Sequence, residues 1–238
     1  MNLILASNSP RRRQLIALAG WDFIVSVSDV DESTHENESP AEYVLRLAES
    51  KARAGISRAN ADQIILAADT TVVDGSDILG KPQNEAEAIQ MLTRLRGRTH
   101  QVYTGVALLR MSDGLLLKDL GVTDVPMRNY SDEEIRAYVA TGDPLDKAGA
   151  YAIQHAQFSP VASMEGCYAS VMGLPLCHVV RMMRKMGVEP NANVPANCQS
   201  LLEYECPVFE SILNNLESGS LLPKAIASYC TPNLKGKE

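Results

Sequence analysis

The stretch Gln63-Ile64-Ile65-Leu66-Ala67-Ala68-Asp69-Thr70 determines the class of fold. Its consecutive apolar side chains show no alternation between an apolar and a polar face, which is typical of a strand buried on both sides. An aspartate directly after such a run is expected at the end of the strand, on the sheet edge where ligands of open α/β proteins bind. The stretch therefore predicts a buried central strand with Asp69 beside a ligand.

Segments with strand and helix patterns alternate on both sides of this run. Strands are predicted over 3–6, 23–27, 100–109 and 115–125, and helices over 10–19, 39–54, 84–95 and 131–140. Ser112-Asp113-Gly114 predicts a hairpin between the last two strands, so part of the sheet is antiparallel. We expect an α/β protein with a mixed central sheet flanked by helices.

Composition bounds the class of protein. The chain has 238 residues, of which 45% are hydrophobic, and a formal net charge of −7. Wholesale disorder is excluded, and no apolar run approaches the roughly 20 residues that span a bilayer. The net charge argues against a nucleic-acid polymer as partner, because phosphate binding needs a basic face. The first residues lack the charge order of a secretory signal. We expect a cytoplasmic protein without a membrane partner.

Residues 188–238 differ in character from the rest of the chain. They are richer in proline, asparagine and serine and show no strand alternation. We expect a main domain over residues 1–187. Beyond it we expect an accessory C-terminal extension that holds one helix around Leu201–Leu216 or is partly disordered.

The cysteines and histidines form no pattern typical of a metal or nucleophile site. The chain has five cysteines, an odd number without a CxxC pair, and they predict reduced thiols. The four histidines are dispersed, and the sequence contains no GxSxG elbow. These patterns support neither a zinc site nor a nucleophilic hydrolase.

The turn Ser7-Asn8-Ser9-Pro10-Arg11-Arg12-Arg13 is a candidate anion site. Ser9 fits the N-cap of a helix, with Pro10 at its first position. The N-terminus of a helix presents free N–H groups and a positive dipole end, and the adjacent hydroxyls and arginines favour a phosphate chain. The same spacing also fits a capped helix whose arginines are merely solvated.

Asp69 is a candidate metal ligand or general base. Asp31 and Glu32 follow the second predicted strand and could join it around a divalent cation, because Mg²⁺ takes one or two carboxylates plus substrate phosphates. Asp69 could instead orient an attacking water. An aspartate that only caps a turn is the structural alternative.

Further polar candidates are Lys51, Lys81, Lys147 and Gln154. Lys81 lies between a glycine and a proline, in a stiff turn from which it could reach a phosphate. Gln154 offers an amide that can pair with a nucleotide base or close a loop. Lysines on turns are more often simply exposed to solvent, so both interpretations stay open.

Seven segments follow one another in the order of a known family: Ser7-x-Ser9-Pro10-Arg11-Arg12, Glu49-x-Lys51-Ala52, Ala68-Asp69-Thr70-x-Val72, Gly80-Lys81-Pro82, His100-x-Val102-x-Thr104-Gly105-Val106, Asp146-Lys147-Ala148-Gly149-Ala150-Tyr151-x-Ile153-Gln154 and Val171-x-Gly173-Leu174-Pro175-Leu176. Over residues 3–187 the chain resembles the Maf family of nucleoside triphosphate pyrophosphatases. The resemblance implies a fold like that of inosine triphosphatases. It also implies a divalent cation, Mg²⁺ or Mn²⁺, and a homodimer. The implied reaction cuts a nucleoside triphosphate between its α and β phosphates.

The resemblance and the residue chemistry together predict the site. The catalytic residues are Asp69, Lys51 and Lys81, and the metal ligands are Glu32 and Asp69. The substrate-binding residues are Ser7, Ser9, Arg11, Arg12, Thr70, Lys147 and Gln154. An arginine of the SPRR segment, Thr70 and Gln154 match the family's pyrimidine branch, which implies dTTP and UTP as substrates.

One departure leaves alternatives open. His155-Ala156-Gln157 stands where the family usually has a glycine and a glycine-rich turn. A pyrophosphatase for a modified purine nucleotide such as 7-methyl-GTP is therefore a second interpretation. A nucleotide-binding regulator of cell division without turnover is the third, independent of this departure, because the acidic extension with its expected helix could bind a partner.

Overall fold

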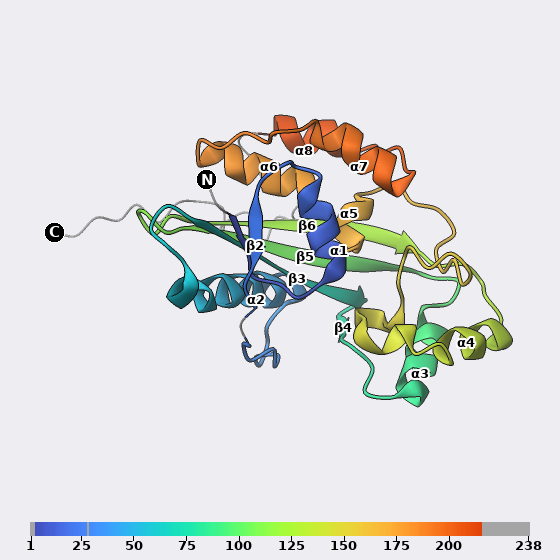
Figure 1. The fold of residues 1–238 in the computed structure, drawn as a ribbon. Coiled ribbons are helices and arrows are strands. Elements are labelled where there is room, and N and C mark those ends of the chain that lie inside the picture. The colour runs from blue at the N-terminus through green and yellow to red at the C-terminus, as the bar shows by residue number, and fades with distance from the viewer. Residues whose placement is uncertain (1–2, 28, 216–238) are drawn as a thin grey trace.

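The computed structural model describes residues 3–27 and 29–215 (Figure 1). A six-stranded mixed sheet with the order β2-β1-β3-β5-β6 forms its centre, and β4 pairs with β3 off this path. The strands are β1 (Leu3–Leu5), β2 (Phe23–Val25), β3 (Ile64–Asp74), β4 (Asp77–Leu79), β5 (Thr99–Arg110) and β6 (Leu116–Pro126). β1 pairs in parallel with β2 and β3, whereas β3, β5 and β6 are antiparallel. The predicted mixed sheet is confirmed.

Helices cover both faces of this sheet (Figure 1). They are α1 (Pro10–Ala17), α2 (Pro40–Ala54), α3 (Glu85–Leu95), α4 (Asp132–Val139), α5 (Tyr168–Val171), α6 (Leu176–Lys185), α7 (Val194–Leu202) and α8 (Phe209–Asn214), with 3₁₀ turns at Ile56–Arg58, Asp143–Asp146 and Ala148–Ala150. α2 lies against one face, and α1, α5 and α6 lie on the other. In the part of the chain that the structure describes, no helix is long and apolar enough to span a membrane.

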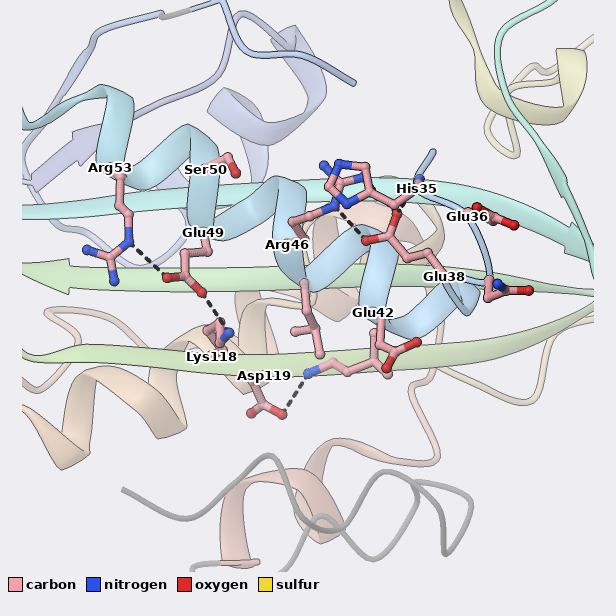
Figure 2. Close-up of a pocket in the computed structure, with 13 residues that line it drawn as sticks. His35, Glu36, Glu38, Glu42, Arg46, Glu49, Ser50, Arg53, Lys118 and Asp119 are labelled. Atoms are coloured by element: carbon pink, nitrogen blue, oxygen red, sulfur yellow. Dashed lines mark hydrogen bonds and ion pairs between the residues drawn. The ribbon is translucent and has the colours of Figure 1, made fainter. Parts of the chain in front are cut away.

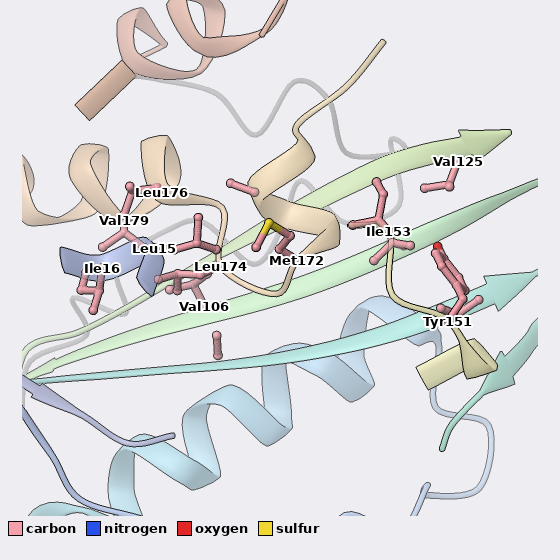
Figure 3. Packing of buried hydrophobic residues seen from close by; sticks show 14 of the residues in the cluster. Leu15, Ile16, Val106, Val125, Tyr151, Ile153, Met172, Leu174, Leu176 and Val179 are labelled. Carbon is pink, nitrogen blue, oxygen red and sulfur yellow. The ribbon is translucent and has the colours of Figure 1, made fainter. Parts of the chain in front are cut away.

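β3 is buried on both faces, as its apolar run predicts. Ile64, Leu66 and Ala68 belong to the larger hydrophobic cluster. This cluster includes Leu15 of α1, Val106 of β5 and Leu174, which precedes α6, as Figure 3 shows. Ile65 and Ala67 belong to a second cluster that packs against α2. β3 is therefore the middle layer between the helices of the two faces.

β3 continues past the point where we expected it to end. The strand runs to Asp74, so Asp69 lies in its middle, and the expected position at a strand end is wrong. On one edge β5 pairs with β3 over residues 64–73. On the other edge, β1 pairs with residues 64–66 and β4 with residues 72–74. Among the described residues, no strand lies beside residues 67–71 on that second edge, so β3 is unpaired there at Asp69 and Thr70.

The extension contains two short helices in place of the single helix expected around Leu201–Leu216. α7 ends at Leu202, where Glu203 turns to a left-handed conformation with φ 48°, and α8 begins only at Phe209. The extension also packs on the main domain. Trp21 Nε1 donates to the Glu189 carbonyl oxygen at 2.9 Å, and Arg181 donates to that of Ile212 at 3.2 Å. The disorder expected of the extension, where it concerns residues 216–238, falls outside the described residues.

A close approach at Gly105 brings α2 onto the sheet. A Cβ at this position would lie 2.5 Å from the Val44 carbonyl oxygen in α2, well inside contact distance. Gly105 is also the cross-strand partner of Asp69. The absence of a side chain at Gly105 therefore sets how near α2, which carries Lys51, comes to Asp69.

We expect Gly105→Ala to destabilise the protein by about 1–3 kcal/mol, because the new methyl group forces α2 away from the sheet. Urea unfolding followed by circular dichroism measures this change in the free energy of unfolding. Gly80→Ala is the matched control, since no described atom lies within 4 Å of a Cβ built there. Equal stability of the two variants would contradict the close approach.

Candidate functional site

One cavity of about 1020 Å³ gathers every residue that the sequence assigned to the site. These residues are Ser7, Ser9, Arg11, Arg12, Glu32, Lys51, Asp69, Thr70, Lys81, Lys147 and Gln154. They come from α1, α2, β3 and the loops around residues 7–9, 29–32, 80–81 and 146–154. The third acid considered at the sequence level, Asp31, does not line the cavity. Its Oδ1 accepts a hydrogen bond from the Ser33 amide instead.

The gap in the edge of β3 explains why one cavity reaches both faces of the sheet. Successive residues of a strand point to opposite faces. Asp69 accordingly meets Lys51 of α2, and Thr70 meets Arg12 of α1. Because no strand covers residues 67–71 on this edge in the described structure, one continuous cavity extends around the open edge of β3 from one face to the other.

Lys51 joins the two acidic residues of the cavity. Its Nζ lies 2.6 Å from Asp69 Oδ1 and 2.6 Å from Glu32 Oε1. Burial disfavours ionisation of Glu32, but the hydrogen bond and charge of Lys51 outweigh it. The hydrogen bond and charge of Lys51, together with the charges of Lys81 and Arg12, hold the pKa of Glu32 below its ordinary value. The site therefore contains two carboxylates around one ammonium group.

Tyr43 is a cavity residue that the sequence analysis did not assign to the site. Its hydroxyl donates to the Glu32 carbonyl oxygen at 2.9 Å and so holds the loop that carries Glu32. Burial, reinforced by the charges of Asp69 and Glu32, raises the pKa of Tyr43 to about 12. Tyr43 lies inside the helix predicted over 39–54, and no local signal in the sequence marks it as a contact of the loop that carries Glu32.

Arg12 is held by three acceptors from separate segments. Its Nε donates to the Gly173 carbonyl oxygen at 2.7 Å, Nη1 to Ser7 Oγ at 3.2 Å and Nη2 to Thr70 Oγ1 at 3.1 Å. Burial lowers the pKa of Arg12, and the charge of Asp69 opposes this shift. Arg11, by contrast, is half-buried and has no hydrogen-bond partner among the described residues. The two arginines therefore differ in how far the protein fixes them.

The two lysines on turns also differ. Lys81 is exposed at the cavity, and its turn is anchored by a hydrogen bond from the Gly149 amide to the Gly80 carbonyl oxygen at 3.0 Å. Lys147 is buried, and its ammonium is bound to Asp143 Oδ1 at 2.9 Å and to Asp146 Oδ1 at 2.6 Å. Lys81 is thus available to a ligand, whereas Lys147 is committed to the fold of its own loop.

The loop after Gln154 is closed where the family pattern has a glycine. His155 Nδ1 accepts from the Phe158 amide at 3.0 Å, and the His155 ring lies 4.6 Å from the ring of Tyr138. Gln154 itself is exposed at the cavity and has no hydrogen-bond partner within residues 3–27 and 29–215. His155 therefore shapes the loop and leaves the Gln154 amide available.

The donor set fits a divalent cation that shares its coordination with a substrate. Glu32 and Asp69 lie against the same ammonium group, so two carboxylates converge on one place. No group of three or more His, Cys, Asp or Glu side chains in the described structure is placed to hold a metal ion by itself. Mg²⁺ is commonly coordinated by one or two carboxylates, with phosphate oxygens and water as its remaining ligands.

Two other cavities lack this combination of free charges. Figure 2 shows a cavity of about 650 Å³ beside α2, in which Glu49 pairs with Arg53 and Lys118, and Arg46 pairs with Glu38. A third, of about 20 Å³, is lined by Cys167, Cys177, Cys198 and Cys206, which form no disulfide. The fifth cysteine, Cys230, lies outside the described residues.

Comparison with known proteins identifies one family and a set of close relatives. The family model described as Maf-like protein matches residues 2–186. The dTTP/UTP pyrophosphatases of Geotalea uraniireducens and Geobacter sulfurreducens are 46% and 48% identical over 186 residues. The alignments cover 78% of this chain and 95% and 96% of theirs. The dITP/XTP pyrophosphatase structure of Mycobacterium abscessus aligns over 55% of this chain and 76% of its own, with 15% identity. The TM-score of this pair is 0.35.

His100 lies behind Tyr151, a residue of the cavity wall, and gives the protein a pH-dependent stability. His100 Nε2 and the Tyr151 hydroxyl are 2.8 Å apart. Burial lowers the pKa of His100 to about 4, against the charges of Asp74 and Asp124. Between pH 6.5 and 4 the unfolded chain therefore binds a proton that the folded protein does not.

We expect the free energy of unfolding to fall as the pH is lowered from 6.5 to 4, with about 3 kcal/mol of that fall due to His100. Urea unfolding of the wild type and of His100→Gln across this range measures the difference. The variant should lose this part of the pH dependence. Parallel pH profiles for the two proteins would contradict the assignment.

Proposed function

Because the chain belongs to the Maf family, we propose that it hydrolyses dTTP and UTP between the α and β phosphates, releasing pyrophosphate and the monophosphate. The observation that carries this proposal is the ammonium of Lys51 bound to both Asp69 and Glu32 inside a cavity with basic walls. Relatives that are 46% and 48% identical are named dTTP/UTP pyrophosphatases, which supports the choice of nucleotides.

The triphosphate would bind where cationic groups are available. Arg11 and Lys81 line the cavity without partners among the described residues, and Ser9 caps the N-terminus of α1 beside them. The N-terminus of a helix and unpaired cations both favour phosphate oxygens. Ser7 lies in the same turn, and its Oγ accepts from Arg12 and from the Ser9 amide, which keeps the turn in shape.

Asp69 would place the attacking water, and it is shielded for this role. The residue is 7% exposed, and its Oδ1 is bound to Lys51, so the carboxylate is held in one orientation. A bound Mg²⁺ or Mn²⁺, held by Glu32 and Asp69, would neutralise phosphate charge and activate the water. Lys51 would balance the negative charge of both carboxylates, and Lys81 that of the leaving pyrophosphate.

The base would bind near Thr70, Arg12 and Gln154. The Gln154 amide lines the cavity and has no hydrogen-bond partner in the described part of the chain, so both its functions can meet a base edge. Thr70 and Arg12 are bound to each other, so they would act as a fixed pair. Lys147 would support this region indirectly, because its ammonium holds the loop that leads to Gln154.

We further propose that the protein acts on free nucleotides as a homodimer, as the family resemblance implies, and in the cytoplasm, as its composition suggests. Multi-angle light scattering of the purified protein would measure its oligomeric state. A monomeric mass would contradict the dimer without affecting the proposed reaction.

A substrate panel tests the proposed reaction. Purified protein would be incubated with dTTP, UTP, CTP, GTP and 7-methyl-GTP, with Mg²⁺ or Mn²⁺ and with EDTA, and pyrophosphate release would be measured. We expect the fastest release from dTTP and UTP and none in EDTA. Preference for 7-methyl-GTP would replace the pyrimidine assignment. Tight binding without release would favour a regulator that does not turn over.

We expect Asp69→Asn to lower kcat for pyrophosphate release from dTTP by at least about 100-fold, because the amide can neither accept a proton nor bind a cation as the carboxylate does. Asp77→Asn is the matched control, since Asp77 of β4 pairs with Arg94 of α3 and does not line the cavity. Circular dichroism would verify that both variants fold. Turnover of Asp69→Asn near that of the wild type would refute the role of Asp69.

A further inference from the structure

A chain of hydrogen bonds runs from the cavity into the core through two threonines. Arg12 Nη2 donates to Thr70 Oγ1 at 3.1 Å, and Thr70 Oγ1 lies 2.9 Å from Thr104 Oγ1. Thr104 Oγ1 in turn donates to the Ser170 carbonyl oxygen at 2.9 Å. Thr104 is 0% exposed and does not line the cavity, so it meets a ligand only through Thr70.

The direction of every bond in this chain is fixed by its two ends. A carbonyl oxygen only accepts, so the single proton of the Thr104 hydroxyl is used on Ser170. The Thr70 proton must therefore go to Thr104. An arginine only donates, and Thr70 Oγ1 accordingly presents a lone pair to Arg12. The Ser170 carbonyl oxygen thus fixes, through Thr104, the direction of the Thr70 hydroxyl proton at the cavity wall.

The register of the sheet brings the members of this hydrogen-bond chain together. Thr70 and Thr104 are cross-strand partners, and Gly121 of β6 is the next residue across from Thr104. A Cβ at Gly121 would lie 2.6 Å from Ser170 Oγ, so the missing side chain admits α5 to this position. The backbone of α5 then lies close enough to accept from Thr104.

We propose that Thr104 is a positioning residue for substrate selection, which orients the Thr70 hydroxyl and through it the Arg12 guanidinium. Three of the five N–H groups of Arg12 are used by Gly173, Ser7 and Thr70. The other two have no acceptor within residues 3–27 and 29–215. This network holds their orientation, and that fixed arrangement recognises a pyrimidine nucleotide in the cavity. The inference rests on the proposed function, because it assigns Thr70 and Arg12 to the substrate.

Thr104→Val tests the inference, because valine keeps the shape of threonine and removes the hydroxyl. Thr70 then loses its acceptor and is free to turn its proton toward Arg12. We expect KM for dTTP and UTP to rise about tenfold, with kcat changed by less than about threefold, as for loss of a hydrogen bond to a charged group. Thr104→Ser keeps the hydroxyl and should stay within about threefold of the wild type.

Thr123→Val is the matched control. Thr123 is also a buried sheet threonine, 2% exposed, but its Oγ1 has no hydrogen-bond partner in the described structure. Its KM should equal that of the wild type. A double variant, Thr70→Val with Thr104→Val, should be no worse than Thr70→Val alone, because Thr104 acts only through Thr70.

Three results would overturn the inference: an unchanged KM in Thr104→Val, an equal loss in Thr104→Ser, or additive losses in the double variant. Calorimetric binding of the nonhydrolysable α,β-methylene analogue of dTTP separates this failure from that of the proposed function. A wild type that binds the analogue but does not hydrolyse dTTP refutes the reaction, and the dissociation constants of the variants still test Thr104. A wild type that neither binds nor hydrolyses refutes both.

Discussion

The difference in length between β1 and β3 is the constraint on which the site depends. β1 pairs with only the first residues of β3, and β4 pairs with only the last, which leaves residues 67–71 open on that edge. In a sheet with equal strands, Asp69 and Thr70 would be separated by the sheet itself. Here both reach one cavity, so groups from opposite faces can act on one ligand.

Two glycines then set how closely the helices approach the faces of the sheet. Gly105 lies across from Asp69 and admits α2 with Lys51, whereas Gly121 continues the row of Thr70 and Thr104 and admits α5. Asp69 and Thr70 are adjacent in β3, but the helix that packs near Asp69 is α2 on one face, and the helix that packs near Thr70 is α5 on the other. One face supplies a cluster of ion pairs, and the other supplies hydroxyl and carbonyl acceptors that hold an arginine.

The sequence predicted most where a local pattern dominates. The helices predicted from residues 10, 39 and 131 begin directly after N-caps at Ser9, Ser39 and Ser131. The end of β3 was predicted wrongly, because an apolar run reports burial and not where pairing on one edge stops. The prediction of one helix around Leu201–Leu216 was also wrong. Glu203 ends α7 in a left-handed conformation, and because this residue is not a glycine, the sequence did not mark it as a helix end.

The sequence by itself determined the chemical inventory of the cavity, because the residue types in the motifs are those that bind phosphates, cations and bases. Only the tertiary structure decided what each group does there. It left Lys81 available and committed Lys147 to its own loop, and it fixed Arg12 with a carbonyl 161 residues away. Such partners follow from strand lengths and from close approaches between distant segments. Those are properties of packing, and no local run of residues encodes them.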